Sequence, residues 1–319
     1  MGLLVEGKWQ DKWYETDKHG GRFVRPETKF RNRIDEAGAH PPEAGRYHLY
    51  VSYACPWAHR TLIARALKGL DHVMSVSVVH SHMDSEGWRF DPSEDGATED
   101  HVNGFDRLHQ VYTAAQSVYT GRVTVPVLWD SQAKTIVNNE SAEILRILNA
   151  DFNGLAADPE LDLYPEALQD EIDKVNERVY HSVNNGVYKA GFATSQEAYE
   201  EAFGALFETL DWLDVRLGSQ RYLAGDAVTE ADWRLFTTLI RFDAVYVGHF
   251  KCNRQRIADY DHLSAYLREL YQWPGVKPTV RLDHIKNHYY GSHPSINPTG
   301  IVPKGPDLDL DAPHRRDQL

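Results

Sequence analysis

The chain has 319 residues, of which 42% are hydrophobic and 25% are charged, a composition typical of globular proteins and long enough for two domains. Its formal net charge of −13, without a long run of Lys or Arg, argues against binding to nucleic acid or to an anionic membrane. Two cysteines exclude a disulfide framework, and no apolar stretch is long enough to cross a bilayer. The first fifteen residues lack the apolar region of a signal peptide, so we expect a cytoplasmic location.

Residues 1–45 predict an extended, ordered arm. The background is polar and punctuated by Gly and Pro, but a disordered tail would contain fewer large aromatic side chains. We expect these aromatic residues to anchor the arm to the body of the protein. They are Trp9, Trp13, Tyr14, Phe23 and Phe30.

A cysteine stands between a predicted strand at 47–51 and a predicted helix that continues through 61–67. Pro56 suits the first helical position, so Cys55 lies at the helix N-terminus, where unpaired N–H groups and the helix dipole favour a thiolate. Ala58 stands where a dithiol motif has its second cysteine, so Cys55 would need an external thiol, commonly glutathione, to complete a redox cycle. The alternative is a buried apolar cysteine, but the strand–Cys–Pro–helix context favours a reactive one.

A second predicted strand at 73–79 completes a βαβ unit, and a long polar insertion at 80–118 follows it. We expect Trp88 of this insertion to lie near the thiol. A third strand is predicted at 123–129 and another at 134–137. Pro126 interrupts the third strand, either as an edge-strand proline or in a cis peptide bond that would present the backbone N–H and C=O of Val125 to an extended peptide ligand.

An amphipathic helix is predicted at 142–148, directly after Glu140 and Ser141. These two residues would either cap the helix or offer a carboxylate and N–H groups to the γ-glutamyl end of glutathione. Arg122 could supply a further positive charge.

From about residue 160 onward helical periodicity replaces the β pattern. Thr229 and Asp232 predict a capping box that opens a buried helix. The stretch 291–319, rich in Pro, Gly and Asp, predicts a tail that lies on the surface or reaches a partner subunit. The predicted helices span 164–185, 195–217, 229–247 and 260–272.

No metal or nucleotide site is predicted. His80 and His82 have no third ligand at a suitable spacing, and the sequence has no Gly-rich phosphate loop. We expect both histidines at the surface, and we expect Cys252 not to approach Cys55.

A thioredoxin-like N-terminal domain joined to an all-helical C-terminal domain is the plan of the cytosolic glutathione transferases, which this chain resembles. The resemblance implies an arm at 1–45, a thioredoxin-like glutathione-binding domain at 46–150 with its insertion at 80–118, a helical domain at 160–290 and a tail at 291–319.

The closer resemblance is to the glutathionyl-hydroquinone reductases, the xi class of glutathione transferases, and it extends over nearly the whole chain. The motifs that carry it are Cys-Pro-Trp-Ala-His-Arg at 55–60, Arg-Val-Thr-Val-Pro-Val-Leu at 122–128, Asn-Asn-Glu-Ser at 138–141, Asn-Asn-Gly-Val-Tyr-Lys-Ala-Gly-Phe-Ala at 184–193 and Arg-Phe-Asp-Ala-Val-Tyr-Val-Gly-His-Phe-Lys-Cys-Asn at 241–253.

The resemblance implies roles for individual residues. Cys55 would be the nucleophile and Tyr188 the proton donor to the leaving aromatic ring, while Tyr246 and Tyr289 would lie near the sulfur and help to lower its pKa. Any single tyrosine is more often a packing residue, but the small neighbours of Tyr188 would allow a ligand to approach closely. The implied glutathione site comprises Trp88, Arg122, Val123, Thr124, Val125, Glu140 and Ser141.

The implied activity is the glutathione-dependent release of hydroquinone from S-glutathionyl-hydroquinones, through a mixed disulfide of Cys55, in a homodimer. Two alternatives stay open. One is an omega-like thioltransferase or dehydroascorbate reductase, which shares the cysteine and the glutathione site. The other is a non-catalytic binding module with the same fold.

Overall fold

The computed structural model describes residues 2–318, and the chain forms two compact units that each combine separate segments of the sequence. The first unit contains the segment up to Trp13, Pro26–Asp162 and Thr279–Ile301. The second contains Tyr14–Arg25, Leu163–Pro278 and the segment from Val302 onward. Among residues 2–318, no helix is both long enough and apolar enough to cross a membrane.

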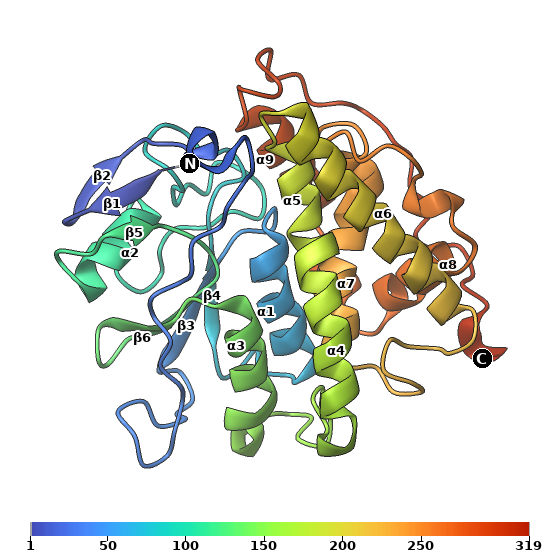
Figure 1. Ribbon diagram of the computed structural model, residues 1–319. Helices are drawn as coiled ribbons and strands as arrows, with labels where there is room; N and C mark the ends of the chain where they lie inside the picture. Colours follow the sequence, from blue (N-terminus) through green and yellow to red (C-terminus); the bar gives the residue numbers. More distant parts are fainter. Residues whose placement is uncertain (1, 319) are drawn as a thin grey trace. The chain divides into compact units, whose positions relative to one another are not determined.

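A four-stranded sheet forms the centre of the first unit (Figure 1). Its strands are β3 (Tyr47–Val51), β4 (Ser75–Val78), β6 (Val127–Asp130) and β7 (Thr135–Asn138), in the order β4-β3-β6-β7. β3 and β4 are parallel and are joined through α1 (Pro56–Leu67), whereas β6 is antiparallel to both of its neighbours. All of β3 is buried, as its apolar and aromatic residues predict, and the βαβ prediction is confirmed.

The predicted strand at 123–129 is wrong in its first half. The structure has only the two-residue strand β5 (Gly121–Arg122) before β6, and the peptide bond between Val125 and Pro126 is cis. Proline has no N–H to donate to a strand neighbour, and this explains why regular pairing begins at Val127.

The arm contains a hairpin that the sequence analysis did not predict. Its strands, β1 (Leu3–Val5) and β2 (Lys8–Gln10), are joined by Glu6 and Gly7, whose φ angles of 48° and 76° are those of a tight two-residue hairpin turn. A Cβ at Gly7 would lie 2.0 Å from the carbonyl oxygen of Ser117, so no other residue fits without a shift of the backbone.

Aromatic residues anchor the arm, as predicted. The Trp9 Nε1–H donates a hydrogen bond of 2.8 Å to the Ser85 carbonyl, and its ring stacks on His109. Phe30 stacks on Tyr119, and β1 pairs with β5. The arm is therefore an ordered part of the fold.

The insertion at 80–118 is more regular than expected, because it contains α2 (Leu108–Ala115). The first unit also contains α3 (Ser141–Arg146), which continues into the π-helical segment η2 (Ile147–Asp151), and α9 (Leu282–Gly291).

Helices make up the second unit, and each of the four predicted helical ranges contains one. The helix predicted at 164–185 is shorter and ends in a π-helical segment. The elements are α4 (Gln169–Val179), η5 (Tyr180–Asn184), α5 (Gly186–Gly191), α6 (Gln196–Leu217), α7 (Glu230–Arg241), η6 (Phe242–Tyr246) and α8 (Asp261–Gln272). Short 3₁₀ segments complete the structure, namely η1 (Thr16–His19), η3 (Asn153–Leu155), η4 (Glu166–Leu168), η7 (Ile257–Asp259), η8 (Lys277–Thr279) and η9 (Arg316–Gln318).

The capping box at the start of α7 is confirmed. Asp232 accepts hydrogen bonds from the Thr229 backbone N–H at 2.7 Å and from the Tyr266 hydroxyl at 2.7 Å. Burial raises the pKa of Asp232. All twelve residues of α7 are buried, so this helix forms the core of the second unit.

Candidate active site

Cys55 is the N-cap residue of α1. Its backbone is extended, with φ −80° and ψ 120°, and Pro56 occupies the first helical position as predicted. The side chain is half-buried, and its Sγ–H donates to the Val125 carbonyl oxygen at 3.5 Å. The fold therefore places the thiol at a helix N-terminus, where partial positive charge favours a thiolate.

Cys252 has the opposite environment. It is fully buried in the second unit, and desolvation raises the pKa of its thiol to about 12. A thiolate is therefore disfavoured at Cys252, and we assign it a packing role.

The segment before Pro126 is fixed by a side chain that the sequence analysis did not identify. The Tyr112 hydroxyl donates to the Thr124 carbonyl at 2.7 Å and accepts hydrogen bonds from the Thr124 N–H at 3.2 Å and from Asn139 Nδ2 at 3.1 Å. This network orients the backbone that carries the carbonyl partner of Cys55. Tyr112 lies in the stretch expected to be a loop, although Leu108, Val111 and Tyr112 recur at helical spacing and form the buried face of α2.

Glu140 and Ser141 occupy the N-terminus of α3. A Glu140 carboxylate oxygen accepts a hydrogen bond from the Ala142 N–H at 3.2 Å, so Glu140 caps the helix. Its other oxygen accepts from the Thr28 hydroxyl at 3.4 Å, and Arg60 donates to the Ser141 hydroxyl at 3.3 Å. The Glu143 and Ile144 N–H groups donate to the Glu140 carbonyl, so the N–H groups of Ala142, Glu143 and Ile144 all have Glu140 as their partner.

Arg122 does not act as an isolated charge in the structure. Its guanidinium donates to the backbone carbonyl groups of Lys12 and Trp13, so it ties the arm to β5. Val123, the next residue, is buried.

Trp88 and Tyr289 come together through α9. The Trp88 indole stacks on His288 with ring centroids 4.7 Å apart and an angle of 24° between the planes. Tyr289 is buried and packs edge-on against His288 and His293. Tyr289 therefore belongs to the same unit as Cys55, although it lies in a helix far along the chain.

Tyr188 and Tyr246 belong to the second unit, in a cluster of aromatic rings. Their ring centroids are 6.2 Å apart, and both pack against Phe250. Tyr246 is fully buried, whereas Tyr188 is half-buried. Phe23 of the arm stacks on Tyr188 and also packs against Phe192.

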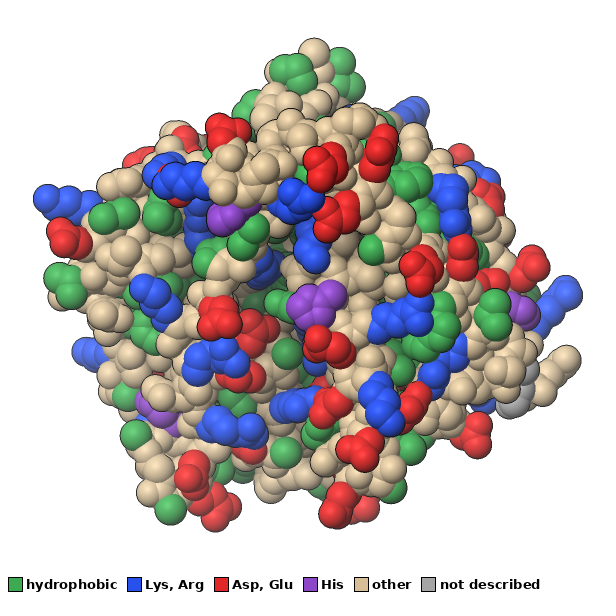
Figure 2. Space-filling view, in the orientation of Figure 1, with side chains coloured by type: hydrophobic (Ala, Val, Ile, Leu, Met, Phe, Trp, Pro, Cys, Tyr) green, Lys and Arg blue, Asp and Glu red, His purple; other side chains and the backbone are tan. Residues whose placement is uncertain are grey.

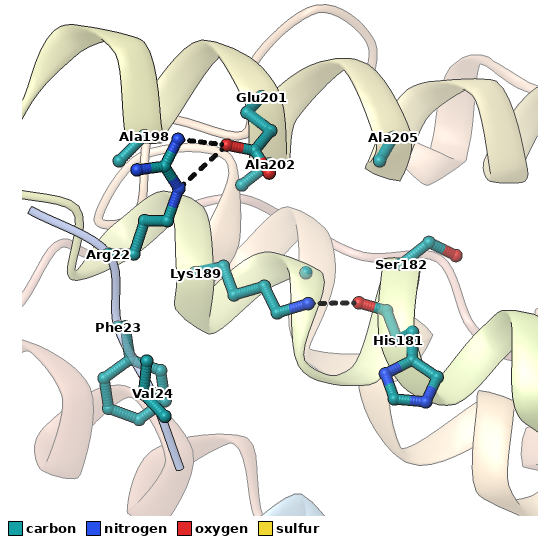
Figure 3. Close-up of a pocket in the computed structure, with 11 residues that line it drawn as sticks. Arg22, Phe23, Val24, His181, Ser182, Lys189, Ala198, Glu201, Ala202 and Ala205 are labelled. Atoms are coloured by element: carbon teal, nitrogen blue, oxygen red, sulfur yellow. Dashed lines mark hydrogen bonds and ion pairs between the residues drawn. The ribbon is translucent and has the colours of Figure 1, made fainter. Parts of the chain in front are cut away.

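A cavity of about 220 Å³ also lies in the second unit (Figure 3). Ala198, Ala202 and Ala205 of α6 form one wall, and Phe23 and Val24 approach from the arm. At its edge Arg22 forms an ion pair with Glu201, and Lys189 Nζ donates to the His181 carbonyl. None of the predicted catalytic or glutathione-binding residues lines this cavity.

On the face shown in Figure 2, acidic and basic side chains are interspersed without a large area of one sign. Across residues 2–318, no group of three or more His, Cys, Asp or Glu side chains is placed to hold a metal ion. His80 is half-buried beside Glu94, so the expectation of a surface position fails for His80 and holds for the exposed His82.

Comparison with known proteins defines the class. The family model described as glutathione S-transferase, N-terminal domain, matches residues 54–151, and the one described as glutathione S-transferase, C-terminal domain, matches residues 196–269. Together with the thioredoxin-like sheet and the helical second unit, these matches define a glutathione transferase.

Two curated relatives show to which group of glutathione transferases the chain is similar. The chain is 58% identical to glutathionyl-hydroquinone reductase PcpF of Sphingobium chlorophenolicum, over 97% of this chain and 98% of the relative. It is 55% identical to glutathionyl-hydroquinone reductase YqjG of Escherichia coli, over 99% of both.

Solved structures indicate the same class as the curated relatives. A xi class glutathione transferase from Natrialba magadii matches with a TM-score of 0.94 and 51% identity, covering 100% of this chain and 97% of that one. The glutathione-bound structure of Escherichia coli YqjG matches with a TM-score of 0.91 and 53% identity, covering 99% of both chains. The chain therefore belongs to the xi class of glutathione transferases, the family of the glutathionyl-hydroquinone reductases.

Proposed function

We propose that this protein is an enzyme that releases hydroquinone from S-glutathionyl-hydroquinones, with glutathione as the second substrate and oxidised glutathione as the other product. The observation that carries this proposal is the Cys55 thiol at the N-terminus of α1, with Ala58 where a second cysteine would stand. A lone activated thiol completes its cycle with an external thiol, and the two curated relatives described above are named for this activity.

The reaction follows from the thiol chemistry. The Cys55 thiolate attacks the sulfur that joins glutathione to the ring, so a disulfide bond forms while the carbon–sulfur bond breaks. The electron pair of that bond passes to the ring carbon, which takes a proton from Tyr188. A second glutathione thiolate then attacks the mixed disulfide, which releases oxidised glutathione and restores the Cys55 thiolate.

The proposed glutathione site has structural support in the first unit. Val125 offers its backbone groups beside the Cys55 sulfur, and Glu140 with Ser141 at the α3 N-terminus suits the ammonium and carboxylate of the γ-glutamyl end. Trp88 completes the site from the insertion. Thr124, which Tyr112 holds, also belongs to the proposed site, together with Arg122, the last residue of β5, and Val123, which follows it.

For the tyrosines, we propose that Tyr188 is the proton donor and that Tyr246 and Tyr289 stabilise the thiolate. The half-buried position of Tyr188 in its aromatic cluster suits a group that meets a planar ring. Replacement of Tyr188 by Phe should lower kcat about 100-fold or more and leave glutathione binding unchanged, because only the proton is lost.

The direct test measures hydroquinone release from S-glutathionyl-hydroquinone by chromatography. Cys55→Ser should reduce turnover at least about 1,000-fold, whereas Cys252→Ser, the matched control, should keep wild-type turnover. Faster turnover of dehydroascorbate or of a simple mixed disulfide would favour an omega-like thioltransferase. Binding of glutathione without turnover of any of these substrates would favour a non-catalytic module.

Initial-rate kinetics provide a second test. A mixed-disulfide intermediate requires ping-pong kinetics, with parallel double-reciprocal lines at different glutathione concentrations. Intersecting lines would count against the scheme.

We further propose that the protein is a cytoplasmic homodimer, because its resemblance to other glutathione transferases implies a dimer. Sedimentation equilibrium of the purified chain should give twice its 36.4 kDa mass. A mass of one chain would contradict the dimer and leave the reaction scheme intact.

A further inference from the structure

Helix α9 is bound to the insertion by a row of polar side chains on one face. Arg281 Nη2 donates to the Asp95 carbonyl at 2.8 Å, and His284 Nε2 donates to the same carbonyl at 2.7 Å. One turn further along, His288 Nδ1 donates to the Ser81 carbonyl at 2.9 Å. The Ser292 hydroxyl then accepts from the Met83 N–H at 2.9 Å. These residues recur at spacings of three and four, which places them along one face of the helix.

Among these residues, His288 also contacts a proposed glutathione-site residue. Its ring stacks on the Trp88 indole at 4.7 Å, and each of the two side chains is only 6% exposed. A carbonyl oxygen can only accept a hydrogen bond, so the Nδ1 atom that faces Ser81 must carry the hydrogen. This bond fixes the orientation of the His288 imidazole ring. The Trp88 indole stacks on the ring that is held in this way.

The backbone of Trp88 is fixed from a different direction. The Trp88 carbonyl accepts a hydrogen bond from the Leu108 N–H at 3.0 Å, at the start of α2, and Arg89 forms a β-bridge with Arg107. These contacts fix the main chain but leave the side-chain torsions of Trp88 to its neighbours. His288 is the stacked neighbour that restricts them.

We propose that His288 is a positioning residue that holds the Trp88 indole in the orientation in which it contacts glutathione. This inference rests on the proposed function, because it takes Trp88 as part of the glutathione site. His288 acts through Trp88 and has no part in the transfer of sulfur.

The test is a double-mutant cycle on glutathione binding, measured by titration calorimetry with glutathione alone. Trp88→Ala and His288→Ala should each raise the dissociation constant about 5- to 10-fold, and the double variant should be no worse than Trp88→Ala. His284→Ala is the matched control, because His284 is buried on the same helix and bonds the same insertion without being stacked on Trp88. Its dissociation constant should stay within about 2-fold of wild type.

Turnover kinetics separate positioning from chemistry. His288→Ala should raise the KM for glutathione and leave kcat within about 2-fold. If His288→Ala does not fold, His288→Phe retains an aromatic ring without the Ser81 bond, and we expect a rise of about 2- to 5-fold in the dissociation constant.

Each contrary outcome has a distinct meaning. Wild-type binding by Trp88→Ala would remove Trp88 from the proposed glutathione site. If Trp88→Ala weakens glutathione binding but His288→Ala does not, the role of His288 is overturned and the site stays intact. The same conclusion follows if the losses of binding free energy in the two single variants add up in the double variant. Equal losses in His284→Ala and His288→Ala would show a general loosening of the insertion, which also overturns the proposal.

Discussion

Single buried charges show how local chemistry controls stability in this protein. Asp130, at the end of β6, is fully buried and accepts hydrogen bonds from Arg46 at 2.6 and 3.0 Å and from His40 at 2.8 Å. Desolvation acts to raise the pKa of Asp130, but the bonds from Arg46, from the Ala133 N–H and from His40 lower it to about 2. The folded state therefore favours the ionised carboxylate.

This pKa predicts loss of stability in acid. Because the pKa of Asp130 falls from 3.8 in the unfolded chain to about 2 in the folded one, the stabilisation is complete above about pH 5 and declines as the pH falls through 3.8 toward 2. Asp130→Asn should lower the free energy of unfolding by about 2 kcal/mol at pH 7, and the deficit should shrink by pH 3. Urea unfolding of the wild type and the variant at pH 7 and at pH 3 measures this difference in the free energy of unfolding. The exposed Asp226→Asn is the control, with an expected change within about 0.5 kcal/mol.

The residues of the candidate site differ in how far the sequence could predict them. The position of Cys55 follows from local signals, since a strand, a proline and a helix adjoin it, and the structure confirms the placement. For Glu140 the sequence left a helix cap and a glutathione contact as alternatives, and the structure shows the cap. Tyr112 and His288 could not be predicted, because their partners Thr124 and Trp88 are set by the packing of separate segments.

Close packing between elements explains Gly191, at the end of α5. The sequence analysis attributed the small residues around Tyr188 to the approach of a ligand. The structure gives another reason at this position, because a Cβ on Gly191 would lie 2.2 Å from the Phe250 ring. The glycine therefore makes room for the aromatic cluster that contains Tyr188 and Tyr246.

Replacement of this glycine should disturb that cluster. Gly191→Ala should lower the free energy of unfolding by about 1–3 kcal/mol, because Phe250 must move, and should reduce turnover with it. Gly204→Ala is the matched control at an exposed position of α6, where an added Cβ meets nothing within 4 Å. That change should raise the free energy of unfolding by about 0.5–1 kcal/mol. Thermal unfolding measures the stability of the two variants relative to the wild type. Equal changes in stability for both variants would contradict the steric explanation.

The lengths of the elements decided which of them could be predicted. The helices of the second unit carry apolar periodicity over several turns, and the predicted ranges contain α4, α6, α7 and α8. β1 and β2 have three residues each, too few to show an alternating pattern, and they were missed. The strand at 123–129 was predicted too long because its valines favour a strand while Pro126 prevents pairing.

In the molecule as a whole, each unit is completed by segments from distant parts of the chain. The C-terminal segment contributes Arg316 to the second unit, where the side chain is 3% exposed. It donates to Glu269 at 3.1 Å and to the carbonyls of Leu217, Gln220 and Arg221. Such pairings depend on tertiary contacts, so composition alone could only indicate that the last residues form a tail.

The tail should therefore contribute to stability. Arg316→Ala should lower the free energy of unfolding by about 2–3 kcal/mol, because a buried carboxylate loses one of its partners and three carbonyl groups lose a donor. The exposed neighbour Arg315→Ala should change it by less than about 0.5 kcal/mol. Denaturant unfolding monitored by circular dichroism measures both. Equal values for the two variants would contradict an anchoring role for Arg316.

The hydrogen bond between His288 and Ser81 joins residues 207 positions apart. On a ribosome that adds about 5–20 residues per second, Ser81 is synthesised roughly 10–40 s before its partner. Throughout that interval the nascent insertion lacks α9, and Trp88 lacks its stacked neighbour. The first unit can therefore reach its final form only after α9 has been synthesised, so chaperone dependence during synthesis should be greatest for this unit.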